Sequence, residues 1–74
     1  MLYYERIREI RDEHRYTQQA IANILNIGQR TYSDYESGRT RIPVESLIIL
    51  AKFYNVSMDY ISGVSDIRGV FPPK

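Results

Sequence analysis

Turn-forming residues divide this 74-residue sequence into five short segments, each with the periodicity of a helix. Asparagine and glycine adopt the left-handed conformation that ends a helix, and proline suits the first turn of one. The breaks fall at residues 14–16, at Asn26 and Gly28, at Gly38 and Pro43, at residues 55–57, and at Gly63. The sequence therefore predicts an all-α fold without strands, with helices over about 2–13, 18–25, 29–37, 43–54 and 58–62.

Apolar side chains recur at three- and four-residue spacing within these segments, and this spacing defines the face of each helix that packs inward. The predicted inward positions are Tyr3, Ile7, Ile10, Arg11 and His14; then Ile21, Ile24 and Leu25; then Tyr32, Tyr35 and Glu36; and then Leu47, Ile48, Leu50, Ala51 and Tyr54. Tyr32, Tyr35, Tyr54 and Tyr60 are thus expected in the core. Such placement argues against their stacking on single-stranded nucleic acid.

Composition narrows the class of protein. The chain has no cysteine, which excludes disulfide bonds and thiolate metal sites, and its single histidine lacks other ligands at metal-binding spacing. No apolar run approaches the roughly 18 residues that span a membrane, and the charged first segment is unlike a signal peptide. We therefore expect one small cytoplasmic domain, with no cofactor and no metal.

The net charge of +1 does not by itself indicate a nucleic-acid-binding protein, but the charges are unevenly distributed. Acidic residues gather in the first segment, at Glu5, Glu9, Asp12 and Glu13. Residues 38–41 read Gly-Arg-Thr-Arg and carry only positive charge. The sequence therefore allows a local basic patch on a nearly neutral protein.

Several short motifs occur in order along residues 6–63: Thr17-Gln18, Ala22, Ile27, Tyr-Glu-Ser-Gly at 35–38, Pro43, and the stretch 50–63. With these motifs the chain resembles the lambda-repressor-like family, the Cro/CI-type (XRE) DNA-binding domains. The resemblance implies a compact five-helix DNA-binding domain over residues 1–63, in which the second and third helices form a helix-turn-helix. It further implies a transcriptional regulator of bacterial or phage type, most often a repressor, and not an enzyme.

The resemblance places the helix 29–37 in the major groove of DNA. Gln29, Arg30, Ser33 and Asp34 lie on its outer face and are expected to contact bases. Glutamine can pair with adenine, and arginine can pair with guanine. Asp34 is open between two roles: it can accept from cytosine, or it can hold the guanidinium of Arg30, its i+4 neighbour.

A second group of residues is expected to contact phosphates, because arginine matches phosphate oxygens with a bidentate fork. The group comprises Gln18, Thr31, Ser37, Arg39, Thr40 and Arg41. For Gln18 the resemblance also implies a brace against Gln29. A lone buried carboxylate at Glu36 would be costly, and the resemblance implies that Arg11 is its partner in a structural ion pair.

One such domain buries too little surface for strong discrimination between sites, so we expect a homodimer that reads two half-sites of a double-stranded DNA operator. Residues 64–74 are expected either to cover the core or to meet a partner through Val64, Ile67, Val70 and Phe71. The alternative function is a protein-interaction module, such as the antitoxin of a toxin–antitoxin pair. An exposed apolar patch around Arg30 and the loop at 38–41 would favour that alternative.

Overall fold

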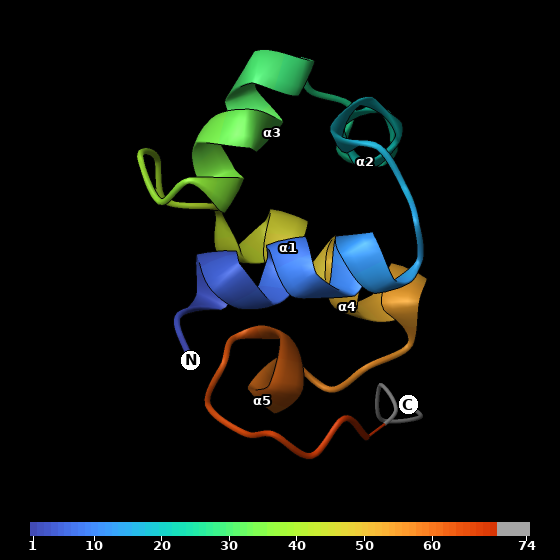
Figure 1. The fold of residues 1–74 in the computed structure, drawn as a ribbon, viewed down its shortest axis with the longest axis vertical. Helices are drawn as coiled ribbons and strands as arrows, with labels where there is room; N and C mark the ends of the chain where they lie inside the picture. Colours follow the sequence, from blue (N-terminus) through green and yellow to red (C-terminus); the bar gives the residue numbers. More distant parts are fainter. Residues whose placement is uncertain (70–74) are drawn as a thin grey trace.

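The computed structural model describes residues 1–69. It contains α1 (Tyr3–Glu13), α2 (Gln18–Leu25), α3 (Gln29–Glu36), α4 (Val44–Tyr54) and α5 (Met58–Ile61), and no strand in this part of the chain (Figure 1). The all-α, five-helix prediction is confirmed, with each helix end within one or two residues of its predicted position. None of the helices in residues 1–69 has the length and apolar character needed to cross a membrane.

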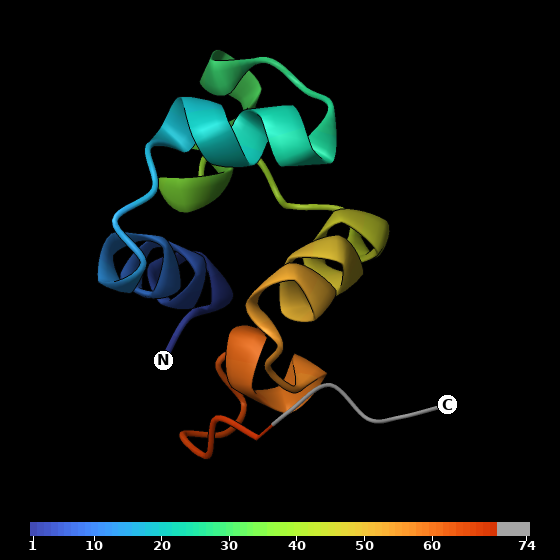
Figure 2. The same cartoon turned by 90° about the vertical axis from the view of Figure 1, so that its right-hand side faces the viewer.

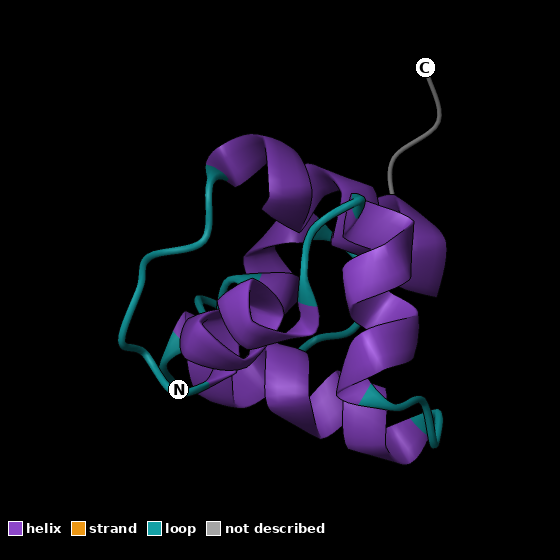
Figure 3. Ribbon diagram, turned by 90° about the horizontal axis from the view of Figure 1, so that it is seen from above, coloured by secondary structure: helices purple, strands orange, loops and turns teal. Residues whose placement is uncertain are grey.

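The helices are arranged around α1 and α4. In Figures 1 and 2, α2 and α3 lie together at one end of the molecule, α5 lies at the opposite end, and α1 and α4 lie between them. Seen from above in Figure 3, loops connect these helices, and the longest of them stands out on the left of the molecule. The arrangement leaves the outer side of α3 away from the rest of the chain.

All five helices contribute to one core. The side chains with no exposed surface include Ile7, Ile10, Ile21, Ala22, Tyr32, Leu50, Ala51 and Ile61. Tyr35, Tyr54 and Tyr60 are also buried, so the prediction that these tyrosines pack in the core is confirmed. They are unavailable as a stacking surface for single-stranded nucleic acid.

Two of the residues that were predicted to pack inward are exposed. Ile24 is 37% exposed, because the buried stripe of α2 runs through Ile21, Ala22 and Leu25 and Ile24 lies to one side of it. His14 is exposed as well, since it follows the last residue of α1. Its ring lies against Tyr54, with 5.0 Å between ring centroids.

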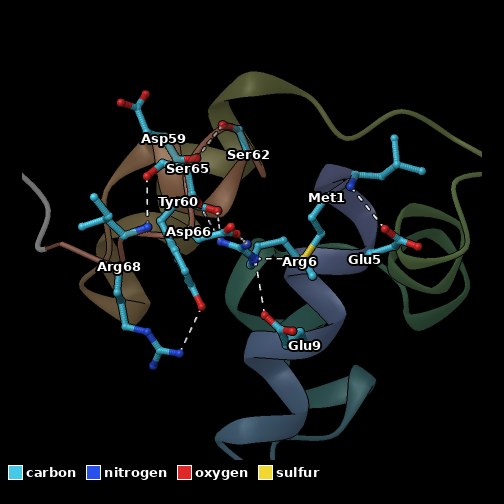
Figure 4. Close-up of polar contacts among 12 residues, drawn as sticks. Met1, Glu5, Arg6, Glu9, Asp59, Tyr60, Ser62, Ser65, Asp66 and Arg68 are labelled. Carbon is cyan, nitrogen blue, oxygen red and sulfur yellow. Dashed lines mark hydrogen bonds and ion pairs between the residues drawn. The ribbon is translucent and has the colours of Figure 1, made fainter.

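Arg6 is a buried residue that the periodicity did not predict, with 2% of its surface exposed. Its guanidinium donates to the backbone oxygens of Tyr60 at 2.6 Å and Ser65 at 3.1 Å, and to the Asp66 carboxylate at 3.0 Å (Figure 4). It also lies 3.9 Å from the centroid of the Tyr60 ring. A buried charge is tolerated when it is fully paired, and here the pairing joins α1 to α5 and to the segment after it.

Residues 64–69 run close to α5 and α1. The Arg68 side chain donates to Glu13 at 2.9 Å, and its backbone oxygen accepts from the Ser57 amide at 3.2 Å. Val64 and Ile67 do not cover the core, since they are 80% and 79% exposed. Of the apolar residues predicted to cover the core or meet a partner, Val70 and Phe71 lie outside the described residues.

The helix ends follow the predicted signals, with one unexpected residue. The Thr17 hydroxyl accepts from the Ala20 amide at 3.0 Å, and Asn26 ends α2 in the left-handed conformation with φ 58°. Between α1 and α2, Arg15 also has a positive φ, of 61°. Side chains larger than that of asparagine rarely adopt this conformation, because Cβ approaches the following carbonyl oxygen.

Replacement of Arg15 by glycine is expected to stabilise the domain by about 1 kcal/mol, because glycine removes the steric cost of the left-handed conformation. Thermal or denaturant unfolding measures the change. Asn26→Gly is the matched comparison and is expected to change stability much less, since asparagine tolerates this conformation. A lower stability for Arg15→Gly than for the wild type would contradict the prediction.

Candidate nucleic-acid interface

α2 and α3 are joined by a tight turn at residues 26–28. The Ile27 amide donates to the Ala22 backbone oxygen at 3.0 Å, and the Asn26 amide donates to that of Asn23 at 3.1 Å. Ala22 has no exposed surface, so a larger side chain at this position would push neighbouring elements apart. The turn and the small residue together hold the two helices close to each other.

The predicted base-contacting residues share the outer side of α3. Gln29 and Arg30 are exposed in its first turn, and Ser33 and Asp34 are half-buried one turn further along. The opposite side of the helix carries Tyr32, Tyr35 and Glu36, all buried. The structure therefore brings Gln29, Arg30, Ser33 and Asp34 together on one surface.

Asp34 lies close to Arg30. Its Oδ1 atom is 3.8 Å from Nε of Arg30, at the i,i+4 spacing that suits a helical ion pair. The Arg30 side chain is 83% exposed and the Asp34 side chain 23%. Asp34 is thus the better-fixed member of the pair.

The backbone of Asp34 also holds the loop after α3 in place. The Asp34 backbone oxygen accepts from the amides of Arg39 at 3.0 Å and Thr40 at 3.2 Å, and from the Ser37 hydroxyl at 3.1 Å. Gly38 has φ 78°, and a Cβ atom there would come within 2.9 Å of the Tyr4 ring. The predicted phosphate contacts of this loop, Ser37, Arg39, Thr40 and Arg41, are all exposed.

Tyr4 is a site residue that the sequence left undecided. It lies half-buried on α1, where its ring supports the loop at Gly38. Tyr4 precedes Ile7 and Arg11 at i+3 and i+7, which is the spacing of one helix face. This spacing could have predicted that Tyr4 lies on the same face of α1 as Ile7 and Arg11.

Glu36 is 4% exposed and accepts hydrogen bonds from three side chains. Arg11 donates through Nε at 2.7 Å and Nη2 at 3.1 Å, the Tyr32 hydroxyl donates at 2.5 Å, and Gln18 Nε2 donates at 3.2 Å. The structure thus contains the Arg11–Glu36 ion pair. The side-chain amide of Gln18 bonds to Glu36, in place of the expected brace against Gln29.

The donors of this cluster keep their protons. Burial, followed by the hydrogen bond to Glu36, raises the pKa of the Tyr32 hydroxyl well above its usual value. The hydrogen bond to Glu36 raises the pKa of Arg11 above its already high value. The cluster therefore contains a permanent positive charge and a permanent hydroxyl donor, both directed at one carboxylate.

A pair of short helices joined by a tight turn, with the polar side of the second helix and a basic loop open to solvent, defines a helix-turn-helix domain. A family model described as "Helix-turn-helix" matches residues 7–61. The chain belongs to this lambda-repressor-like helix-turn-helix family.

Relatives of this chain are described as transcriptional regulators. It is 37% identical over 65 residues to the uncharacterized HTH-type transcriptional regulator YobD of Bacillus subtilis, a match that covers 88% of this chain and 58% of YobD. It is 36% identical over 63 residues to the HTH-type transcriptional regulator ImmR of Bacillus subtilis, covering 85% of this chain and 50% of ImmR. The cryptic phage CTXphi transcriptional repressor RstR of Vibrio cholerae is 36% identical over 55 residues, covering 74% of this chain and 50% of RstR.

A solved structure shows the same fold. The crystal structure of a transcriptional regulator from Listeria innocua matches with a TM-score of 0.79 at 34% sequence identity, covering 82% of this chain and 57% of that one. The chain spans about half the length of the curated relatives it matches.

Replacement of Glu36 by glutamine is expected to destabilise the domain by about 3 kcal/mol, because the partly buried guanidinium of Arg11 loses its countercharge. Denaturant unfolding measures the loss. Glu13→Gln is the control, since Glu13 pairs with Arg68 at the surface, where an ion pair is worth at most about 1 kcal/mol. Equal effects of the two substitutions would contradict the role assigned to Glu36.

Proposed function

We propose that this protein is a sequence-specific, double-stranded-DNA-binding transcriptional regulator that inserts α3 into the major groove. The observation that carries the proposal is the composition of the outer surface of α3 and its loop. Gln29, Arg30, Arg39 and Arg41 are exposed there. Within residues 29–41, all of which are described, no large apolar side chain is exposed. Such a surface suits a polyanion, and the exposed large apolar side chains nearest to it in sequence, Ile24 and Val44, lie outside residues 29–41.

The proposed contacts divide into bases and phosphates. Gln29 and Arg30 occupy the first turn of α3, the part of a recognition helix that reaches base edges, and Ser33 lies one turn further along the same side. Gln18, Thr31 and the loop residues Ser37, Arg39, Thr40 and Arg41 would bond phosphates at the edges of the groove. The phosphate contacts fix the register, and the base contacts supply the specificity.

Charge distribution supports this orientation on DNA. Within residues 29–41, Arg30, Arg39 and Arg41 are exposed, whereas the two carboxylates, Asp34 and Glu36, are half-buried and buried. A nearly neutral protein can therefore present a positive surface on one side. The exposed arginines would supply the sequence-independent part of the affinity.

Repression is the direction of regulation that we propose, on the support of the relative RstR, which is described as a transcriptional repressor. Occupation of an operator by this domain would exclude other proteins from the same DNA.

We also propose that the protein acts as a homodimer on two half-sites, because one domain buries too little surface for strong discrimination. Val64 and Ile67 are 80% and 79% exposed, so their side chains are available to such a partner.

Selection from random duplex DNA is expected to enrich a motif with two related half-sites. Arg30→Ala is expected to abolish the preference for one guanine in each half-site, at a cost of about 1–3 kcal/mol. The helical content and unfolding midpoint of the variant show that it is folded. A wild-type protein that enriches no motif above non-specific binding would refute the proposed function.

Arg39→Ala is expected to weaken binding to all sequences alike and to lower the slope of log affinity against log salt by about 1, since one phosphate contact is lost. Titrations at several salt concentrations measure the slope. Arg8→Ala is the matched control, because Arg8 is an exposed arginine on α1. A slope that falls equally in both variants would remove Arg39 from the phosphate contacts.

A further inference from the structure

We propose that Asp34 is a positioning residue: it orients Arg30 toward guanine, contacts no base itself, and weakens binding to DNA that lacks this guanine. The inference rests on the proposed function and names the part of the operator that this pair of residues would read.

The ion pair uses the side of the guanidinium that guanine does not need. Asp34 Oδ1 lies near Nε of Arg30, at 3.8 Å, which leaves the two terminal Nη nitrogens free. A bidentate contact to O6 and N7 of guanine can be made with this terminal pair of nitrogens. Arg30 can therefore remain paired to Asp34 while it bonds the base.

Asp34 is less exposed than Arg30, with 23% of its side chain accessible against 83%. Its backbone oxygen accepts from Ser37, Arg39 and Thr40, so the main chain that carries the carboxylate is held by the loop. The Arg30 side chain extends into solvent with 83% of its surface exposed, and ordering such a side chain on DNA costs conformational entropy. A carboxylate one turn away restricts the guanidinium before DNA binds, which reduces that cost.

The negative charge of Asp34 explains why it would weaken binding to DNA that lacks the guanine. A carboxylate at a DNA-facing surface repels phosphates unless a cation neutralises it. Arg30 provides this cation while it points at the groove floor. On DNA without the guanine, an arginine free of Asp34 could turn to a phosphate instead, and the ion pair opposes that turn. Asp34 thereby lowers the affinity for incorrect sites.

A direct contact between Asp34 and cytosine is the competing role. That contact would require a carboxylate that extends toward the groove. In the structure the Asp34 side chain is only 23% exposed, and its Oδ1 lies at an ion-pair distance of 3.8 Å from Nε of Arg30. The geometry favours the positioning role, and the two roles give different results in a double-mutant cycle.

The experiment uses the selected duplex and a second duplex in which the G·C pair read by Arg30 is replaced by A·T. The ratio of the two affinities is measured for the wild type, Asp34→Ala, Arg30→Ala and the double variant. Asp34→Ala is expected to lower the ratio about twofold, the size of an exposed i,i+4 pair, mainly by raising the affinity for the A·T duplex. In the Arg30→Ala background, Asp34→Ala is expected to leave the ratio unchanged.

Glu9→Ala is the matched control, because it removes one negative charge from α1, and it is expected to leave the ratio unchanged. Unfolding midpoints confirm that each variant is folded. The proposal is overturned if Asp34→Ala alone leaves the ratio at the wild-type value. It is equally overturned if Asp34→Ala removes a base preference in the Arg30→Ala background, since Asp34 then reads that base itself. Both results require that the wild type selects a motif, so they differ from failure of the proposed function.

Discussion

The carboxylate of Glu36 connects three of the five helices, because its donors come from α1, α2 and α3. A buried carboxylate is costly without such partners, so the three helices are held in the one arrangement that supplies all of them. The outward direction of Gln29 and Arg30 depends on this arrangement. α3 has only eight residues, and a helix of that length is not stable alone in water.

Two arginines on α1 are paired in the same way, one with each of two distant parts of the molecule. Arg11 bonds to Glu36 of α3, whereas Arg6 bonds to Tyr60 of α5 and to residues 65–66. One helix thus carries two arginines that pair with different elements, and α3 and α5 lie at opposite ends of the molecule (Figure 1). The segment after Gly63 belongs to this network through Ser65 and Asp66. Residues 65–66 are therefore tied to α1 by side-chain contacts.

The proposed DNA-binding surface combines rigid supports with mobile side chains. The Asp34 backbone and the Tyr4 ring fix the loop, while Arg30, Arg39 and Arg41 extend into solvent. Long arginines lose conformational freedom when they bind DNA, and fixed supports limit that loss to the side chains themselves. The ion pair between Arg30 and Asp34 extends this support to one of the side chains that face the groove.

The sequence by itself determined the helix boundaries and the buried tyrosines, because capping, turn formation and helical periodicity act over a few residues. The family was indicated by the resemblance of the ordered motifs over residues 6–63. It also placed Gln29, Arg30, Ser33 and Asp34 on one side of a helix. Only the tertiary structure decided the partners of Arg6 and Gln18 and the exposure of Ile24, Val64 and Ile67. The Arg6 contact with Tyr60 spans 54 positions of the sequence. No local pattern specifies such a contact, since it forms only when all the helices have packed.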